Sequence, residues 1–509
     1  MTKSTSVQPV GRTNISKYLV VVLVVGMIVG ALWVRTIDLG ADPLDVAHPQ
    51  QLFFLLTARS FQPAPGLKTA GLPTSGDYIS ASRDFPLLQI AAAGVSGALN
   101  VGLTEAARIL SVLGWVMASL LVFFLLRKIT HTLIAVAALA LMLFMPYAIE
   151  FSRVVLPGSW ALFFTILGLW MLWRWLETPS WKSAVLCGVY GLVAVMLEPE
   201  VLFILGGALV PAAILHLKKS SDQQWMQILV IGAFLIVPRY AYELAMHSNA
   251  GLIGNWLGID GIPLKLSALK QISRLELRTE SIIGALGIGF AVLGILLTAK
   301  GVKRSLLTGM WVGFGLFCLL SLNSIANSIY LLYPLIFLTA LSLVSIMEAL
   351  LERISELKMQ AVSAAVLVAV LIVGAGLGML DGRRLVKANP DQIPVDFWRS
   401  LGKEMGPSSV FLTNTDSVNL PLAYYGKVRP VCLQTSGCLA SVGQAAQELK
   451  DYQVYFVTFQ NSLEQDPAIS FYFDPQMLHC DAGSGITVFP ITYKDSFCKV
   501  PVGKGTSTP

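Results

Sequence analysis

YLVVVLVVGMIVGALWV, at residues 18–34, is an apolar run long enough to cross a lipid bilayer as a helix. It follows an N-terminal tail that carries Lys3, Arg12 and Lys17, and no clear small-residue cleavage site comes after it. Of the 509 residues, 55% are hydrophobic and only 13% are charged, whereas soluble proteins carry about 25% charged residues. The sequence therefore predicts a polytopic α-helical membrane protein whose first span is an uncleaved signal anchor.

Further segments have the length and apolar composition of membrane spans. They lie near residues 105–126, 132–148, 157–176, 183–198, 200–216, 226–244, 281–299, 305–322, 329–347 and 361–380. Together with the first run, they give about eleven transmembrane helices. The weakest boundary between two of them is the stretch LEPEV at 197–201.

The distribution of Lys and Arg predicts the orientation, because cytoplasmic loops of membrane proteins are enriched in both. With the N-terminus in the cytoplasm, every loop on that side is basic, for example HLKK at 216–219 and KGVKR at 300–304. The loops on the opposite side, such as NSIANS at 323–328, are poor in Lys. An odd number of spans then places the C-terminus outside.

Two regions outside the membrane follow from this topology. Residues 35–104 form a long first outer loop with short interfacial helices, within a transmembrane domain that covers residues 1–384. Residues 385–509 have the composition of a small soluble α/β domain. Its predicted strands are 410–414, 454–459 and 485–493, and its predicted helix is 441–452.

Four cysteines, Cys432, Cys438, Cys480 and Cys498, all fall in this outer region. An even number there indicates one or two disulfides in an oxidising compartment, and the four residues allow three pairings. The alternative is that these cysteines bind a zinc ion, although no paired CxxC spacing occurs.

Carboxylates and arginines gather at the outer boundary of the membrane. The acids are Asp38, Asp42, Asp45, Asp77, Asp84, Glu105, Glu150, Glu198 and Glu200, and the arginines are Arg35, Arg59, Arg83, Arg108, Arg153 and Arg239. Solvation of the interface is the simple interpretation for most of them. Arg nevertheless replaces Lys on this side, and its guanidinium makes two-pronged contacts with phosphate oxygens. An outer cavity of this composition could bind a phosphate-linked substrate and deprotonate a hydroxyl.

Several stretches share a pattern with one family of membrane enzymes. They are DVAHPQQLFFLLTARSF (45–61), RDFPLLQ (83–89), AARILSVL (106–113), MPYAIEFSRVVLPGSWALFF (145–164), NSIYLLYPLIFLTAL (327–341) and VFLTNTDSVNLPLAYYGK (410–427). They resemble the GT-C superfamily of glycosyltransferases, specifically the bacterial branch similar to dolichyl-phosphate-mannose–protein mannosyltransferases and lipid A aminoarabinose transferases. The resemblance implies a multi-pass protein of the bacterial inner membrane with a periplasmic C-terminal domain.

The resemblance also implies roles for particular residues. Asp45 matches the catalytic acid, a base that deprotonates the acceptor hydroxyl as it attacks and inverts the anomeric carbon. Asp84 could orient the acceptor or share that role, or it could cap the helix that begins near Phe85. The donor would be a polyprenyl-phosphate-linked sugar, and the acceptor a protein, a lipid or a glycan.

Arginines, or a divalent metal as an alternative, would offset the charge of the leaving phosphate. No other cofactor is expected. The candidate substrate-binding residues are His48, Gln51, Arg59, Arg83, Arg153, Glu198, Arg239 and Tyr330.

Two positions depart from the family pattern. Gly158 stands where related sequences often have an acid, and Glu198 stands where they often have a lysine. These departures leave open a catalytically silent scaffold. A transporter is the other alternative, although ionisable residues near the midplane and internal repeats, which are typical of transporters, are not found. A polymerase or ligase of lipid-linked glycans is a further possibility, and nothing indicates nucleic-acid binding.

Overall fold

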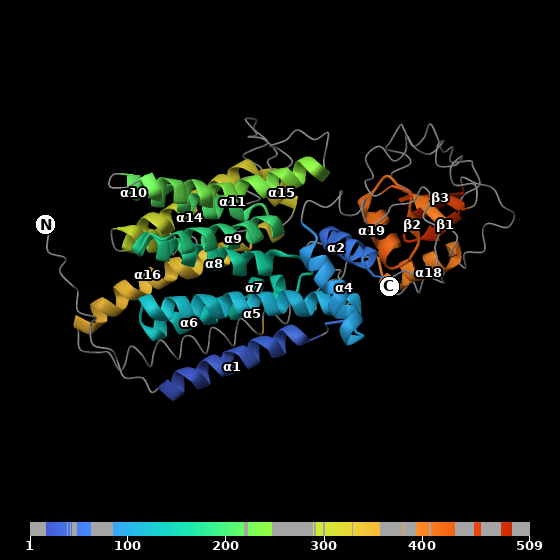
Figure 1. Ribbon diagram of the computed structural model, residues 1–509. Helices are drawn as coiled ribbons and strands as arrows, with labels where there is room; N and C mark the ends of the chain where they lie inside the picture. Colours follow the sequence, from blue (N-terminus) through green and yellow to red (C-terminus); the bar gives the residue numbers. More distant parts are fainter. Residues whose placement is uncertain are drawn as a thin grey trace. The chain divides into compact units, whose positions relative to one another are not determined.

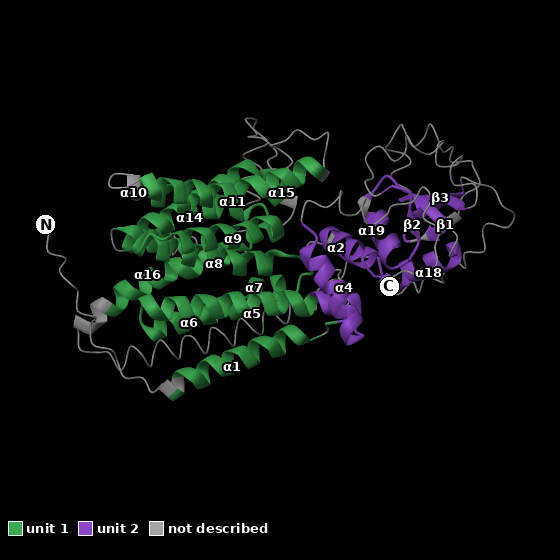
Figure 2. Cartoon of the chain, viewed as in Figure 1, with its two compact units in different colours: residues 1–39, 108–388 green, residues 40–107, 389–509 purple. Residues whose placement is uncertain are grey.

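The computed structural model describes residues 17–37, 39–40, 42, 48–62, 85–217, 222–246, 289, 292–298, 301–327, 329–356, 380, 393–406, 409–432, 452–459 and 480–490. The chain divides into two compact units, coloured separately in Figure 2. Unit 1 comprises residues 1–39 and 108–388, and unit 2 comprises residues 40–107 and 389–509. The expected domain boundary after residue 384 lies outside the described residues and stays a prediction.

Unit 1 is an assembly of helices (Figure 1). Its described elements are α1 (Lys17–Thr36), α5 (Leu103–Ile129, of which the first residues belong to unit 2), α6 (Thr132–Phe144), α7 (Pro146–Phe151), α8 (Gly158–Glu177), α9 (Trp181–Leu197), α10 (Val201–Leu217), α11 (Asp222–Met246), α14 (Val302–Leu320), α15 (Leu322–Asn327), the 3₁₀ turn η1 (Ile329–Leu332) and α16 (Pro334–Glu356).

The helices follow the apolar runs of the sequence. Each expected span coincides with a described helix, except 281–299 and 361–380, which lie mostly outside the described residues. Within the described part, five helices are long and apolar enough to cross a membrane: Leu103–Ile129, Gly158–Glu177, Asp222–Ala245, Val302–Leu320 and Tyr330–Leu351. Others, such as α6, α9 and α10, are shorter apolar helices. The chain is therefore a multi-pass membrane protein, and eleven stays a prediction for its number of spans.

Helices α10 and α14 pack through glycines. A Cβ atom on Gly207 would meet the carbonyl oxygen of Gly309, and one on Gly313 would meet the carbonyl oxygen of Phe203. Gly309 itself faces Gly207 and the ring of Pro211. In lipid, the hydrophobic effect does not drive apolar helices together. Close backbone approach is therefore a main source of helix–helix attraction in a membrane.

Arg35, in the last turn of α1, is fully buried and fastens that helix to the segment from α6 to α7. Its guanidinium donates to the Oγ of Ser152 at 2.6 Å and to the carbonyl oxygens of Leu143 at 2.8 Å and Ala148 at 3.3 Å. Leu143 lies in the last turn of α6, where carbonyls lack a partner within the helix and carry partial negative charge. Arg35 is therefore a structural cation.

We expect Arg35→Met to lower the melting temperature of the detergent-solubilised protein, because buried acceptors lose their donor at about 1–3 kcal/mol each. Arg35→Lys should recover part of the loss, since an ammonium keeps the charge without the planar fork of donors. Arg127→Met, at an exposed position of α5, is the control. Equal melting temperatures for Arg35→Met and Arg127→Met, measured by intrinsic fluorescence, would contradict this role.

Unit 2 contains two helices from the first outer region, α2 (His48–Ser60) and α4 (Leu87–Leu99), and two from the C-terminal region, α18 (Val395–Met405) and α19 (Asp416–Tyr424). Helix α2 packs against both α4 and α19, and its Leu52, Leu55 and Ala58 are fully buried. Helix α4 leaves Leu87 and Ile90 exposed, as expected for a helix that lies at a membrane surface.

The sheet of unit 2 is mixed and has the strand order β2-β1-β3-β5-β4. Its strands are β1 (Ser409–Leu412), β2 (Arg429–Pro430), β3 (Gln453–Phe459), β4 (Cys480–Gly483) and β5 (Ile486–Pro490). Strand β1 pairs in parallel with β2 and β3, whereas β5 is antiparallel to both β3 and β4. This confirms a small C-terminal mixed sheet, while the expected helix at 441–452 lies outside the described residues.

The cysteines of unit 2 are described only in part. Cys432 is disulfide-bonded. Its partner is not among the described features, so the pairing of the four cysteines stays a prediction.

Candidate functional site

Glu198 occupies the corner between α9 and α10. Helix α9 ends at Leu197, and Pro199 follows Glu198, so the chain turns before α10 begins at Val201. The Glu198 backbone is extended, and its N–H donates to the carbonyl oxygen of Ala194. The side chain is only 3% exposed, so its carboxylate has to be satisfied by protein groups.

Tyr330 supplies one of these groups. It lies in η1, directly before α16, and its hydroxyl donates to Oε1 of Glu198. The same hydroxyl accepts the backbone N–H of Gly158, the first residue of α8, at 3.1 Å. This one hydroxyl joins the start of α8, the C-terminal end of α9 and η1, which precedes α16. Two of the expected site residues, Glu198 and Tyr330, therefore lie together.

An aromatic cluster surrounds this contact. The ring of Phe151 lies 5.1 Å from those of Tyr330 and Tyr333, 5.3 Å from Trp115 and 6.0 Å from Tyr147. A Cβ on Gly158 would come within 2.9 Å of both Phe151 Cζ and Tyr330 Oη. Gly158 therefore leaves room for these rings, and an acid at this position would displace them.

Arg239 lies on α11 near the same corner. Its guanidinium pairs with Glu243, one helical turn further on, and donates to the carbonyl oxygen of Met196 at 3.4 Å, two residues before Glu198. The ring of Tyr242 lies 5.4 Å from the guanidinium carbon. Arg239 thus fixes α11 to the last turn of α9, with its charge balanced by a carboxylate.

Arg153 lies in the turn that follows α7. It is 3% exposed, and its backbone N–H donates to the carbonyl oxygen of Glu150 at 3.0 Å. The side chain is close enough to Arg35 for the two charges to interact. Arg153 therefore lies between α7 and α8, two residues after Phe151 of the aromatic cluster.

In unit 2, helix α2 carries Gln51 and Arg59. Gln51 is fully buried. Arg59 donates to the carbonyl oxygens of Tyr424 at 3.0 Å and Ala423 at 3.4 Å, and its guanidinium carbon lies 4.3 Å from the centre of the Tyr424 ring. These carbonyls end α19, so Arg59 caps that helix and anchors α2 to it.

The remaining candidates are described incompletely. Asp45, Arg83 and Asp84 lie outside the described residues, and only the backbone of His48, the first residue of α2, is described. Their roles stay predictions. Among the described residues, no three His, Cys, Asp or Glu side chains gather as a metal site.

Some partners in this region were not expected from the sequence. Glu243 follows Arg239 by four residues on one helix, a spacing that signals an ion pair. Phe151, Tyr333 and Tyr424 carried no comparable signal, because their contacts join segments far apart in the chain.

Comparison with known proteins finds one family model that matches part of the chain. Residues 90–246 match the model of the family described as dolichyl-phosphate-mannose-protein mannosyltransferase. This range includes Phe151, Gly158, Glu198 and Arg239. No curated protein sequence matches the chain significantly.

Solved structures share the fold at low sequence identity. ArnT from Cupriavidus metallidurans, bound to undecaprenyl phosphate, has a TM-score of 0.60 and 12% identity, and the match covers 94% of this chain and 99% of that chain. The oligosaccharyltransferase AglB from Archaeoglobus fulgidus, with an inhibitory peptide and a dolichol-phosphate, has a TM-score of 0.52 and 13% identity, over 88% and 70% of the two chains. Residues 90–246 are thus similar to the dolichyl-phosphate-mannose-protein mannosyltransferase family, and the chain shares its fold with ArnT and AglB.

Proposed function

We propose that this protein is an inverting glycosyltransferase that moves a sugar from a polyprenyl phosphate to an acceptor on the outer side of the membrane. The observation that carries the proposal is the family match across residues 90–246, which contains the buried Glu198 corner and its neighbours. The fold adds support, because structures that share it were solved with undecaprenyl phosphate or dolichol-phosphate bound.

The proposed chemistry needs one base and a charge to receive the leaving group. Asp45, three residues before α2, would deprotonate the acceptor hydroxyl while the bond from the anomeric carbon to the phosphate oxygen breaks. Asp84 would orient the acceptor. The lipid phosphate leaves as an anion, and we assign Arg83 and Arg153 to it.

Arg59 and Arg239 take positioning roles in this scheme. Arg59 donates to carbonyls of α19, and Arg239 is paired with Glu243. Both guanidinium groups therefore already bind acceptors within the protein and position helices. Gln51 and His48, on α2, would contact sugar hydroxyls. In unit 1, Glu198 and Tyr330 would bind the substrate, with the carboxylate oriented by the tyrosine hydroxyl.

The proposal is tested by offering donors to the purified protein in liposomes. Radiolabelled sugars on polyprenyl phosphate and the corresponding nucleotide sugars are supplied separately, with a membrane extract as the source of acceptors. We expect label to move into an acceptor from the lipid-linked donors only. Transfer from the nucleotide sugars alone, or no transfer from a broad set of lipid-linked donors by protein that is folded, would reject the proposed function.

Tyr330→Phe tests the corner of the site. The change removes the hydroxyl that donates to Glu198 and accepts the Gly158 N–H, so both buried groups lose a partner at a cost of about 1–3 kcal/mol each. We expect a lower melting temperature and reduced transfer. Tyr190→Phe, which removes a hydroxyl on α9 far along the helix from Glu198, should change neither quantity. Wild-type transfer and melting by Tyr330→Phe would contradict a role for this contact.

A further inference from the structure

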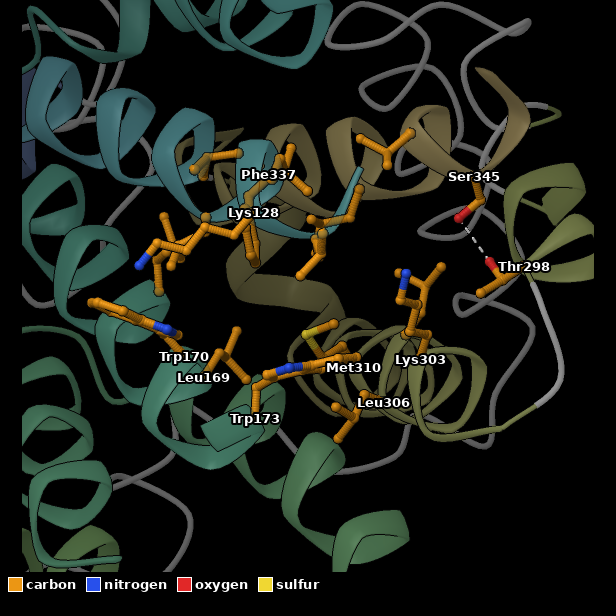
Figure 3. A pocket seen from close by; sticks show the side chains of 18 of the residues that line it. Lys128, Leu169, Trp170, Trp173, Thr298, Lys303, Leu306, Met310, Phe337 and Ser345 are labelled. Carbon is orange, nitrogen blue, oxygen red and sulfur yellow. Dashed lines mark hydrogen bonds between the residues drawn. The ribbon is translucent and has the colours of Figure 1, made fainter. Parts of the chain in front are cut away.

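A cavity of about 540 Å³ lies in unit 1 between α5, α8, α14 and α16 (Figure 3). Its walls are mostly apolar and include Leu169, Met310 and Phe337, with Trp170 and Trp173 on the α8 side. The volume is within the range of about 300–1,000 Å³ that is typical of small-molecule sites. This cavity is distinct from the candidate functional site.

The separation follows from the helices that the two places share. On α8, Gly158 starts the helix beside Tyr330, whereas Trp170, Trp173 and Arg174 line the cavity near its other end. At 1.5 Å per residue, Arg174 lies roughly 24 Å along the axis from Gly158. On α16, the lining runs from Phe337, one turn after the helix start at Pro334, to Glu348, and the charged side chain lies at the far end of this stretch. The charged part of the cavity therefore lies at the end of the bundle that the basic loops predict to be cytoplasmic, and its apolar part extends toward the middle of the helices.

Cations surround this cavity on three helices. Lys128 on α5, Arg174 on α8 and Lys303 on α14 line it, together with two carboxylates, Glu177 and Glu348. Three positive and two negative charges leave a net charge of +1 on the lining. The indole N–H of Trp173 donates to Oε1 of Glu177 at 2.7 Å, and Lys128 Nζ lies 4.7 Å above the ring of Trp170. An anionic group would complete the balance of charge.

The start of α14 points to the same conclusion. The helix begins at Val302 after Gly301, without a side-chain cap and without an acid in its first turn. Lys303 instead lies in that turn, where a cation is unfavourable because the first N–H groups already carry partial positive charge. An anion bound beside Lys303 would remove this conflict and accept from the unpaired N–H groups.

We propose that this cavity binds an anionic glycerophospholipid of the inner leaflet. One acyl chain lies among the apolar side chains, and the phosphate of the headgroup contacts Lys128, Lys303 and Arg174. Tryptophans are typical of this depth, because an indole ring sits well at the boundary between lipid tails and headgroups. Basic pockets between membrane helices on the cytoplasmic side are known to select anionic lipids. The proposal does not depend on the glycosyltransferase function.

The test measures lipid retention by native mass spectrometry of the full-length protein. The protein is exchanged into detergent with dioleoyl-phosphatidylglycerol or dioleoyl-phosphatidylcholine, which share acyl chains and differ in headgroup charge. We expect the wild type to retain phosphatidylglycerol preferentially. Lys128→Gln with Lys303→Gln should lower that preference on the order of ten-fold, because each cation near a membrane surface contributes severalfold to anion binding. Arg127→Gln with Arg304→Gln, at the neighbouring positions that do not line the cavity, is the matched control.

A second variant addresses the acyl chain. Met310→Trp should fill the cavity and abolish retention of phosphatidylglycerol, whereas Leu316→Trp, at an exposed position of the same helix, should not. Equal retention of the two lipids by the wild type, or equal losses in the two double variants, would overturn the proposal. Stronger retention of a polyprenyl phosphate than of phosphatidylglycerol would also overturn it, as would displacement of the lipid by inorganic phosphate.

Discussion

Asp45→Asn is expected to reduce sugar transfer by a factor of about 10²–10⁴, the usual contribution of a general base. The amide keeps the shape of the side chain but cannot take the proton of the acceptor hydroxyl. Binding of the lipid-linked donor should change little, so the loss should appear in kcat rather than in KM. Initial rates with a labelled polyprenyl-phosphate sugar over a range of donor concentrations separate the two quantities.

A matched control for this variant lies three residues earlier. Asp42→Asn makes the same change in a partly exposed carboxylate that pairs with Arg399 at 3.3 Å. Exposed ion pairs contribute about 0–1 kcal/mol, so Asp42→Asn should retain nearly full transfer and a wild-type melting temperature. If both variants keep wild-type rates, Asp45 is not the base, and Asp84→Asn becomes the variant to measure.

Gly313→Val is expected to prevent most of the protein from folding. A Cβ at this position would overlap the carbonyl oxygen of Phe203 on α10, and backbone on both helices would have to move apart. Overpacking of a tight interface costs about 1–3 kcal/mol, and more where backbone rather than a flexible side chain is displaced. In the membrane, the separation also removes the close contact that holds α10 to α14.

Gly315 provides the control on the same helix, because a Cβ there would meet no atom within 4 Å. Gly315→Val places the same side chain two residues away and should give monodisperse protein in wild-type yield. Size-exclusion chromatography of the solubilised proteins and their melting temperatures compare the two variants. A wild-type yield and melting temperature for Gly313→Val would show that the α10–α14 interface can open without cost.

The helices of unit 1 could be predicted from their apolar runs, which are long enough to span a bilayer. In lipid, such a segment satisfies its backbone hydrogen bonds by forming a helix. The boundary at LEPEV was the weakest expected, and Pro199 places it between Leu197 and Val201. Three strands of the outer region, β1, β3 and β5, were also predictable from their short apolar runs, whereas β2 and β4 were not predicted. The order of the strands in the sheet was not predictable either, because β1 lies between β2 and β3 through pairings that the local sequence does not encode.

The roles of the outer arginines could not be predicted from the sequence. Arg in place of Lys indicated phosphate binding, but Arg35, Arg59, Arg108 and Arg239 all donate to backbone carbonyls. A guanidinium with five donors is equally suited to carbonyls at helix ends, so composition does not separate the two uses. The contact between Tyr330 and Glu198 spans 132 residues, and only the folded chain brings them together.

The packing of α2 against α19 has a consequence for the order of events during synthesis. The contact from Arg59 to Ala423 joins residues 364 apart, so the first loop meets its partner only after most of the chain has been translated. At about 5–20 residues per second, the ribosome needs about 20–70 s to cover that distance. Throughout this interval α2 can pack against α4 but lacks its second partner, α19. A nascent or truncated chain would therefore insert into the membrane before α2 contacts α19, and we expect the proposed transfer only from completed molecules.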